Sequence, residues 1–204
     1  MKRKLLAMAA ALFCMAAVVG GTLAFFTSEA TSHNVITTGA VAIEIDEQMA
    51  ITDENGTVTG YEKFPKEGIK DVMPGTQQSK IVRVKNTEQA EAWVRASVAK
   101  SFELAEGRQG QIDPELVTLD INEDAWLDGG DGYYYCKKAV KPGEMTEPLF
   151  TTVTFKTEMG NLYQNSTAHV NVYAQAVQTA NNPIPKGGDV SDVLGWPAKD
   201  EGKV

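Results

Sequence analysis

The sequence has few of the residues that build metal centres, cross-links and nucleophilic sites. Among its 204 residues only two are histidine, His33 and His169, and only two are cysteine, Cys14 and Cys136. No His-Glu-x-x-His segment brings two imidazoles and a carboxylate to one helix face, and no Gly-x-Ser-x-Gly segment marks a serine nucleophile. The composition therefore argues against the common zinc and serine hydrolases, and we expect both histidines to be solvated.

Helical periodicity is also missing beyond the N-terminus. Apolar and polar residues alternate instead, as they do in a half-buried strand. Val94, Ala96 and Val98, for example, alternate with Arg95 and Ser97. Similar runs are found at residues 35–45, 82–85, 92–98, 117–121, 149–156 and 170–176. The sequence therefore predicts seven or eight short strands.

Glycine and proline separate these runs. They stand in the turn pairs Asn55-Gly56, Pro74-Gly75 and Pro142-Gly143, where they supply the backbone angles that turns require. Short helical turns are expected near Pro114 and near Asp189, whose carboxylate can cap a helix. The pattern is typical of an all-β fold, an antiparallel two-sheet β-sandwich of jelly-roll type with short helical insertions.

One long hydrophobic run is present, at the N-terminus. A basic stretch, residues 2–4, precedes the apolar residues 5–19, and Thr22-Leu23-Ala24 offers small side chains three residues and one residue before a cut. This order predicts a signal peptide, residues 1–24, cleaved between Ala24 and Phe25. The alternative is an uncleaved anchor, because the uncharged stretch from Leu5 to Phe26 is long enough to span a bilayer.

Basic charge is scarce once the signal peptide is removed. Of the 19 Lys and Arg residues, three leave with it, so 16 face 27 Asp and Glu, a net charge of −11. Such an acidic chain argues against nucleic acid and anionic lipid as partners. Cys136 is then the one remaining cysteine, which excludes an intramolecular disulfide. Its place in an alternating run predicts a packed thiol rather than a reactive or intermolecular one.

The best imitation of a metal site is the acidic stretch 120–131. Asp120, Asn122 and Asp124 stand at the first, third and fifth positions of a calcium loop. The sixth position has Ala125 instead of glycine, and the twelfth has Asp131 instead of glutamate. Asp120, Asn122, Asp124 and Asp131 are therefore only weak calcium candidates. We expect an acidic loop between strands with no cofactor.

Two aromatic groups could serve as binding surfaces. Tyr133-Tyr134-Tyr135 could stack on a ligand, but three consecutive residues in a strand point to alternate faces, so we expect them to divide between core and rim. Trp93 and Arg95 share one face of one strand and can stack on each other. We expect that pair to cover surface rather than to clamp a ligand.

The order of motifs resembles a known family. The segment 20–27 and the segment 38–43 are similar to the leader region of the SipW-dependent exported proteins, the TasA/camelysin family of bacterial matrix and cell-surface proteins. The remaining similar stretches are 72–75, 131–135, 142–150 and 174–178. The likeness covers roughly residues 4–180, and the leader is its most specific part.

This resemblance implies a jelly-roll domain that assembles into extracellular fibres, with the new N-terminus of one subunit acting as a strand in the next. Applied to this sequence, it divides the mature chain into a donor segment, residues 25–40, and a domain, residues 41–180. Residues 181–204 are rich in proline and poor in apolar groups, so we expect a flexible C-terminal tail.

Within the donor segment the resemblance implies that Phe25, Phe26, Val35 and Ile36 contact the neighbouring subunit. Exposed phenylalanines on a free end are a liability for a monomer. Burying each one in a neighbour is worth roughly 1.5–3 kcal/mol before the cost of ordering. Alternatively, Phe25 and Phe26 fold back on their own domain or serve only the signal peptidase.

The sequence thus predicts a secreted, non-enzymatic protein of a bacterial extracellular matrix or cell surface. The expected partners are other copies of the chain, a signal peptidase of SipW type and a related matrix protein. Membrane contact is expected only through an uncleaved leader. Two alternatives remain: a cell-surface metallo-endopeptidase of camelysin type, on resemblance alone, and a monomeric surface module that binds through its loops.

Overall fold

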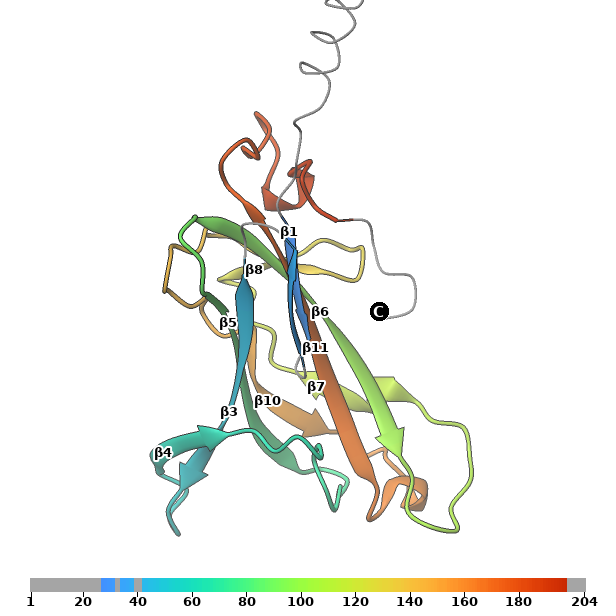
Figure 1. The fold of residues 1–204 in the computed structure, drawn as a ribbon. Coiled ribbons are helices and arrows are strands. Elements are labelled where there is room, and N and C mark those ends of the chain that lie inside the picture. Colours follow the sequence, from blue (N-terminus) through green and yellow to red (C-terminus); the bar gives the residue numbers. More distant parts are fainter. Residues whose placement is uncertain (1–26, 32–33, 39–41, 198–204) are drawn as a thin grey trace, which may run out of the picture.

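The computed structural model of the protein describes residues 27–31, 34–38 and 42–197 (Figure 1). The strands in these residues are β1 (Thr27–Thr31), β2 (Asn34–Thr38), β3 (Ile43–Thr52), β4 (Val58–Lys63), β5 (Gln77–Asn86), β6 (Ala92–Glu103), β7 (Val117–Leu119), β8 (Trp126–Asp128), β9 (Tyr134–Cys136), β10 (Phe150–Phe155) and β11 (Thr167–Gln178). Three 3-10 turns accompany them: η1 (Pro114–Leu116), η2 (Asn161–Tyr163) and η3 (Val190–Asp192). Among the described residues there is no helix with the length and apolar character needed to cross a membrane.

The strands form two antiparallel sheets, which confirms the all-β sandwich predicted from the alternation. Sheet A has the strand order β2-β1-β11-β6-β9-β8, and sheet B has the order β4-β3-β5-β10-β7. From β5 onwards the chain crosses from one sheet to the other, through β5, β6, β7, β9, β10 and β11 in turn, with β8 added beside β9. Such repeated crossing is typical of a jelly roll. The β3–β4 hairpin extends sheet B and projects at the lower left of Figure 1.

The core lies between the two sheets. Sheet A contributes alternate residues, for example Val94 and Ala96 of β6, which are fully buried. Sheet B faces them with Val82, Val84, Phe150, Val153 and Phe155. Each large apolar side chain that leaves water contributes roughly 1.5–3 kcal/mol. A one-residue slip would turn a whole strand face outward, so this core fixes the strand register.

Residues 27–31 and 34–38, which belong to the predicted donor segment, form two strands of sheet A in this structure. Residues 27–31 and 34–38 form a hairpin whose first strand pairs with β11 of the same chain. β2 and β3 are also separate strands, whereas the alternation had suggested one run over residues 35–45. Figure 1 shows the hairpin alongside β11 and β6.

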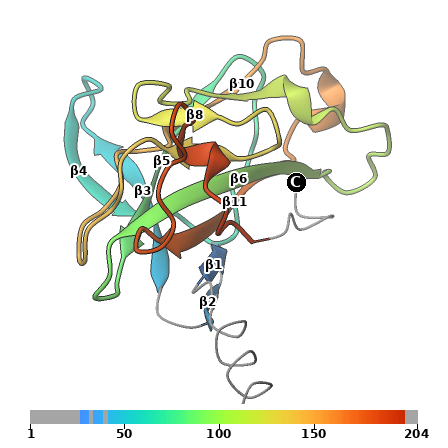
Figure 2. The same ribbon diagram turned by 90° about the horizontal axis from the view of Figure 1, so that it is seen from above.

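The prediction of a flexible tail over residues 181–204 is wrong for residues 181–197, which pack on sheet A. Val190 and Val193 are each 3% exposed, and the Trp93 indole donates to the Asn182 carbonyl oxygen at 2.9 Å. The expected cap is present, since the Asp189 carboxylate accepts from the Ser191 backbone N–H at the start of η3. Figure 2 shows this C-terminal segment, in red, beside β8 and β6. The prediction relied on the low apolar content of this segment. The few apolar residues that it has are spaced so that they all reach one patch of sheet A.

Candidate functional site: the strand position beside β11

β1 is held on both of its edges. Its five residues pair with β11 in a regular register that runs from Thr27 opposite Val177 to Thr31 opposite Tyr173. On the other edge, β2 pairs with β1 over the same five residues. The strand that follows the predicted cleavage site thus occupies a defined position in sheet A, the strand position beside β11.

Only two of the four predicted subunit-contact residues lie among the described residues. Val35 and Ile36 lie in β2, which is the outer strand of sheet A, opposite Ala30 and Glu29 of the same hairpin. Their backbone partners within this chain are thus Ala30 and Glu29, and contact of Val35 and Ile36 with a neighbouring subunit stays a prediction. The cleavage-site residues Ala24 and Phe25, and the second aromatic Phe26, lie outside the described residues.

β11 is longer than the strand beside it. β11 has twelve residues, and β1 covers only Tyr173 to Val177. Near the other end, Ala168 and Ile69 exchange two backbone hydrogen bonds of 2.9 and 2.8 Å. Between these two regions, residues 169–172 pair with no described strand on this edge. The strand position is therefore followed by four residues of β11 that pair with none of the described strands on this edge.

One row of residues crosses sheet A at the middle of this position. Glu29 is opposite Gln175, Gln175 is opposite Arg95, and Arg95 is opposite Tyr135. Residues directly opposite each other in antiparallel strands share a face of the sheet. Because the neighbours of Gln175 in β11 are core alanines, Gln175, Arg95 and Tyr135 lie on the outer face of sheet A.

Arg95 is buried on that outer face, with only 3% of its surface exposed. Its Nε and Nη2 donate to Gln175 Oε1 at 2.8 and 2.6 Å. Nη2 also donates to the Pro197 carbonyl oxygen at 2.7 Å, and Nη1 donates to the Tyr135 hydroxyl at 3.2 Å. A guanidinium stays charged at all ordinary pH values. These acceptors therefore take the place of the water molecules that the charge loses on burial.

Aromatic rings complete the surroundings of the guanidinium. Its central carbon lies 4.1 Å from the centre of the Tyr133 ring and 5.1 Å from that of Trp196, distances typical of cation–π contacts. Burial raises the pKa of Tyr135, although the hydrogen bond from Arg95 opposes this shift. The Tyr135 hydroxyl donates onward to Asp131 Oδ2 at 2.9 Å.

This arginine–aromatic cluster corrects one prediction and confirms another. Trp93 and Arg95 were expected to cover surface, but they lie beneath the C-terminal segment. The three tyrosines do point to alternate faces, with Tyr133 and Tyr135 in this cluster and Tyr134 packed against the main core. The signal that could have found the cluster is Trp196, a large apolar residue in a segment otherwise poor in them.

The calcium candidates do not converge. The Asp120 carboxylate accepts from the backbone N–H groups of Thr151 and Thr152 at 2.9 and 2.6 Å, so it ties the loop to β10. Asn122 Oδ1 accepts from the Ala125 N–H at 3.3 Å. Asp131 accepts from Tyr135, as described above. In the part of the chain that the structure describes, no group of three or more His, Cys, Asp and Glu could hold a metal ion.

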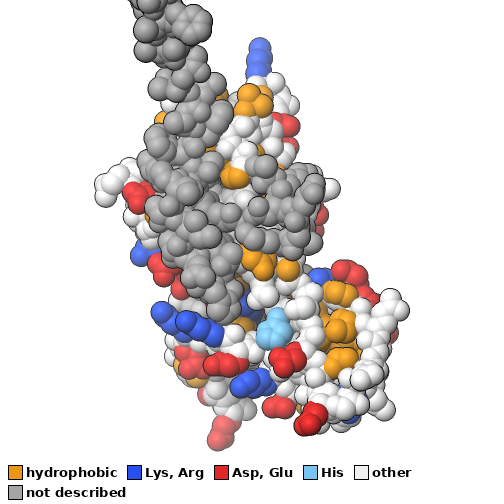
Figure 3. Space-filling model, turned by 45° about the vertical axis from the view of Figure 1, so that its right-hand side comes forward, with side chains coloured by type: hydrophobic (Ala, Val, Ile, Leu, Met, Phe, Trp, Pro, Cys, Tyr) orange, Lys and Arg blue, Asp and Glu red, His pale blue; other side chains and the backbone are white. Residues whose placement is uncertain are grey.

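His169 lies on the outer face of β11, and its side chain is 31% exposed. Its Nε2 is 3.8 Å from Glu103 Oε2, which is the only ion-pair partner within reach of it among the described residues. Figure 3 shows acidic and basic side chains mixed around the histidine on this face. His33 lies outside the described residues, so the pair of histidines carries no site here.

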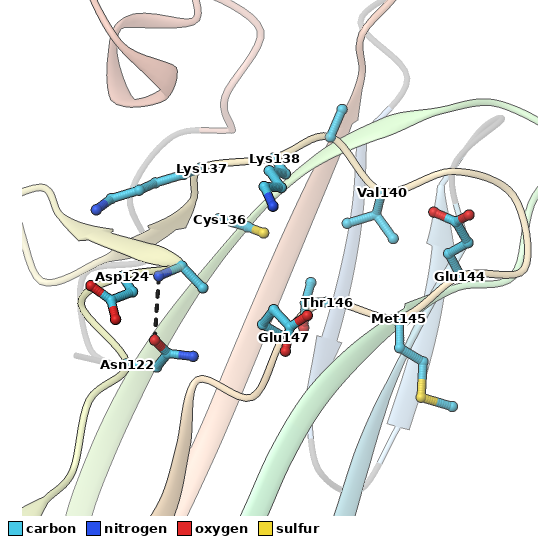
Figure 4. Close-up of a pocket in the computed structure, with 12 residues that line it drawn as sticks. Asn122, Asp124, Cys136, Lys137, Lys138, Val140, Glu144, Met145, Thr146 and Glu147 are labelled. Carbon is cyan, nitrogen blue, oxygen red and sulfur yellow. Dashed lines mark hydrogen bonds between the residues drawn. The ribbon is translucent and has the colours of Figure 1, made fainter.

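A cleft beside Cys136 lies between residues 136–140 and 144–147 and holds about 500 Å³ (Figure 4). Its polar groups carry both signs of charge, among them Lys138 and Glu144, and they do not point to one centre. Cys136 is buried at 4% exposure, as predicted for a packed thiol. Burial raises the pKa of this thiol, which keeps it protonated and a poor nucleophile.

A second buried cation lies between the sheets. Lys80 of β5 is 3% exposed, and its Nζ is 2.9 Å from Glu47 Oε1 of β3 and 4.0 Å from the centre of the Phe64 ring. Burial lowers the pKa of Lys80, and Glu47 opposes that shift. The pair joins two neighbouring strands of sheet B and gives no nucleophile access to solvent.

Comparisons with known proteins leave the family open. No family model matches the chain, and neither a curated protein nor a solved structure is similar to it. The TasA/camelysin resemblance therefore stays a prediction from the residues quoted for it.

Proposed function

We propose that the protein is a secreted structural subunit of a bacterial extracellular matrix, and that it assembles into fibres when the N-terminal strand of one copy pairs with β11 of the next. The observation that supports this best is the place of β1. β1 begins at Thr27, close behind the predicted cleavage site, and pairs edge to edge with β11 over five residues.

A strand that is held mainly by backbone pairing can be supplied by either of two chains. Backbone hydrogen bonds are the same whichever copy donates the strand, and this equivalence is the basis of strand addition and of domain swapping. When the donor leaves its own domain and enters the next, the contact is head-to-tail and does not close. Such a contact propagates as a filament.

The unpaired edges of both sheets favour a protein that assembles over one that remains monomeric. Among the described residues the outer strands are β2, β8, β4 and β7. Edge strands are templates for pairing with another chain. A surface metallopeptidase is not proposed, because nothing in the described residues favours it.

Removal of residues 25–34, the part of the donor segment that contains β1, tests the proposal. We expect the mature chain, residues 25–204, to form filaments visible by electron microscopy, and a chain that begins at Val35 to form none. A chain that lacks residues 198–204 is the control for shortening and should form filaments like the mature protein. Filaments from the chain that begins at Val35 would contradict strand donation.

A disulfide trap tells whether the strand comes from the same chain or from a neighbour. Ser28 is directly opposite Ala176, so the double variant Ser28→Cys/Ala176→Cys brings two thiols together wherever β1 pairs with β11. Oxidised filaments should run on a non-reducing gel as a ladder of linked chains. Disulfides formed within single chains, with no ladder, would show that β1 pairs with β11 of its own chain. Ser28→Cys alone is the matched control and should give no ladder.

A further inference from the structure

The outer end of the β3–β4 hairpin is, in the described part of the chain, a ribbon of two strands. β5 pairs with β3 as far as Gln48, and β4 pairs with β3 from Gln48 to Thr52. Beyond Gln48, the Ala50 N–H donates to the Ser79 hydroxyl at 3.0 Å and not to a strand backbone. A two-stranded ribbon is marginally stable in water, and a third strand stabilises it. The hairpin is therefore suited to a further strand beside β4.

The free edge of β4 is open to such a strand. Among the described residues β4 is the longest outer strand, with six residues against five in β2 and three each in β7 and β8. All of its residues except Gly60 are exposed. Proteins usually protect such edges with charged residues or proline. Residues 57–61, Thr-Val-Thr-Gly-Tyr, contain neither, and Val58 and Tyr61 are 48% and 60% exposed.

The free backbone groups of β4 belong to alternate residues. The Phe64 N–H donates to the Glu47 carbonyl oxygen at 3.0 Å, which fixes the hydrogen-bonding phase of the hairpin. In this register Glu62 bonds to β3 in the same way. The N–H and C=O groups of Tyr61 and Lys63 therefore point away from β3. A strand added at this edge must pair with Tyr61 and Lys63.

Charge selects one register for a second copy of β4. If two antiparallel copies were centred on Glu62 or on Lys63, like charges would face each other directly, which is destabilising. Centred on Gly60, the pair would have no side chains at its middle. Centred on Tyr61, it places each Glu62 opposite Gly60 of the other copy and forms a tyrosine–tyrosine pair, and cross-strand aromatic pairs are favourable.

We propose that two copies of the protein pair edge to edge through β4, antiparallel, about a two-fold axis at Tyr61. This contact joins sheet B of one copy to sheet B of the other in one continuous sheet. It uses the same surface twice and closes with two copies, unlike a head-to-tail contact. It does not rest on the proposed fibre, whose contact lies in sheet A. Where both contacts form, the β4 contact links neighbouring filaments side by side.

A single cysteine tests the axis. In Tyr61→Cys the two thiols face each other across it, within reach of a disulfide. Oxidation of the mature chain, residues 25–204, should then give a dimer band on a non-reducing gel, with or without filaments. A dimer band from this variant is distinct from the ladder expected of Ser28→Cys/Ala176→Cys, so either contact can fail without the other.

Ile51→Cys is the matched control for the cysteine test. Ile51 lies in β3 of the same hairpin and is 42% exposed. In the proposed dimer its two copies are three strand spacings apart, about 14 Å, which is too far for a disulfide. This variant should therefore give little dimer. No dimer from Tyr61→Cys, or equal dimer from both variants, would overturn the proposal.

Hydrogen exchange tests the same contact without a new thiol. Pairing gives the outward N–H groups of Tyr61 and Lys63 a strand as partner. Their exchange should become about tenfold slower between dilute and concentrated protein, because a hydrogen bond to the other copy then protects them. Exchange that does not depend on concentration would contradict the pairing.

Charge variants at Tyr61 separate self-pairing from pairing with another strand. Tyr61→Lys places two like charges opposite each other at the axis and should remove the concentration dependence. Mixing Tyr61→Lys with Tyr61→Glu restores opposite charges, so slow exchange should return in the mixture. If Tyr61→Lys keeps the slow exchange, or the mixture does not recover it, the two-fold axis at Tyr61 is wrong.

Discussion

Two buried cations, Arg95 and Lys80, have the same 3% exposure but different surroundings. Arg95 lies on the outer face of sheet A, and its partners come from β11, β9 and the C-terminal segment. Lys80 lies between the sheets, and its one charged partner is Glu47 on the neighbouring β3. Burial is therefore the same in both places, but only Arg95 joins parts of the chain that are far apart in sequence.

The difference follows from the chemistry of the two groups. A guanidinium presents a planar fork of five donors, so it can bind several acceptors at once and still stack on aromatic rings. An ammonium is a compact charge that can lose its proton when it is buried. The arginine is suited to hold the C-terminal segment on sheet A, next to the strand position that takes the N-terminal strand.

Loss of the arginine should be the largest effect. Arg95→Ala would remove the donor that binds the Gln175 amide oxygen and the Pro197 carbonyl oxygen. We therefore expect the free energy of unfolding to fall by about 3 kcal/mol. Urea unfolding followed by tryptophan fluorescence measures this, because Trp93 and Trp196 lie in the cluster. Arg95→Lys keeps the charge but loses the fork, and should lie between the alanine variant and the wild type. A loss below about 1 kcal/mol in Arg95→Ala would contradict the role given to it.

The C-terminal segment offers a sharper, smaller comparison between two adjacent residues. Val193 is 3% exposed and Leu194 is 87% exposed. Val193→Ala should reduce the free energy of unfolding by about 1–2 kcal/mol, because it removes buried methyl groups. Leu194→Ala should change it by less than about 0.5 kcal/mol. Equal losses in the two variants would mean that this segment is not docked on sheet A in solution.

The sandwich could be read from the sequence, whereas the cluster around Arg95 could not. The alternation of residues such as Val94 and Ala96 reports which face is buried, and turn residues report where strands end. Neither signal says which distant segment covers an outward residue. Arg95 alternates as a surface residue should, and only the path of residues 181–197 buries it.

The smallest expected effect is a pH dependence that separates the two cations. Because burial lowers the pKa of Lys80 below 10.5, the unfolded chain binds more protons than the folded protein between that lowered pKa and 10.5. The free energy of unfolding contributed by Lys80 therefore rises with pH through this window, and the penalty for burying its charge is present below it. The stability of the wild type relative to Lys80→Met should therefore increase as the pH rises towards 10.5, and urea unfolding at a series of pH values measures this. Lys66→Met, at an exposed position nearby, is the control and should track the wild type throughout. Arg95→Ala leaves the Lys80 ammonium in place, so a matching pH trend in Arg95→Ala would show that the trend in Lys80→Met does not come from the ammonium.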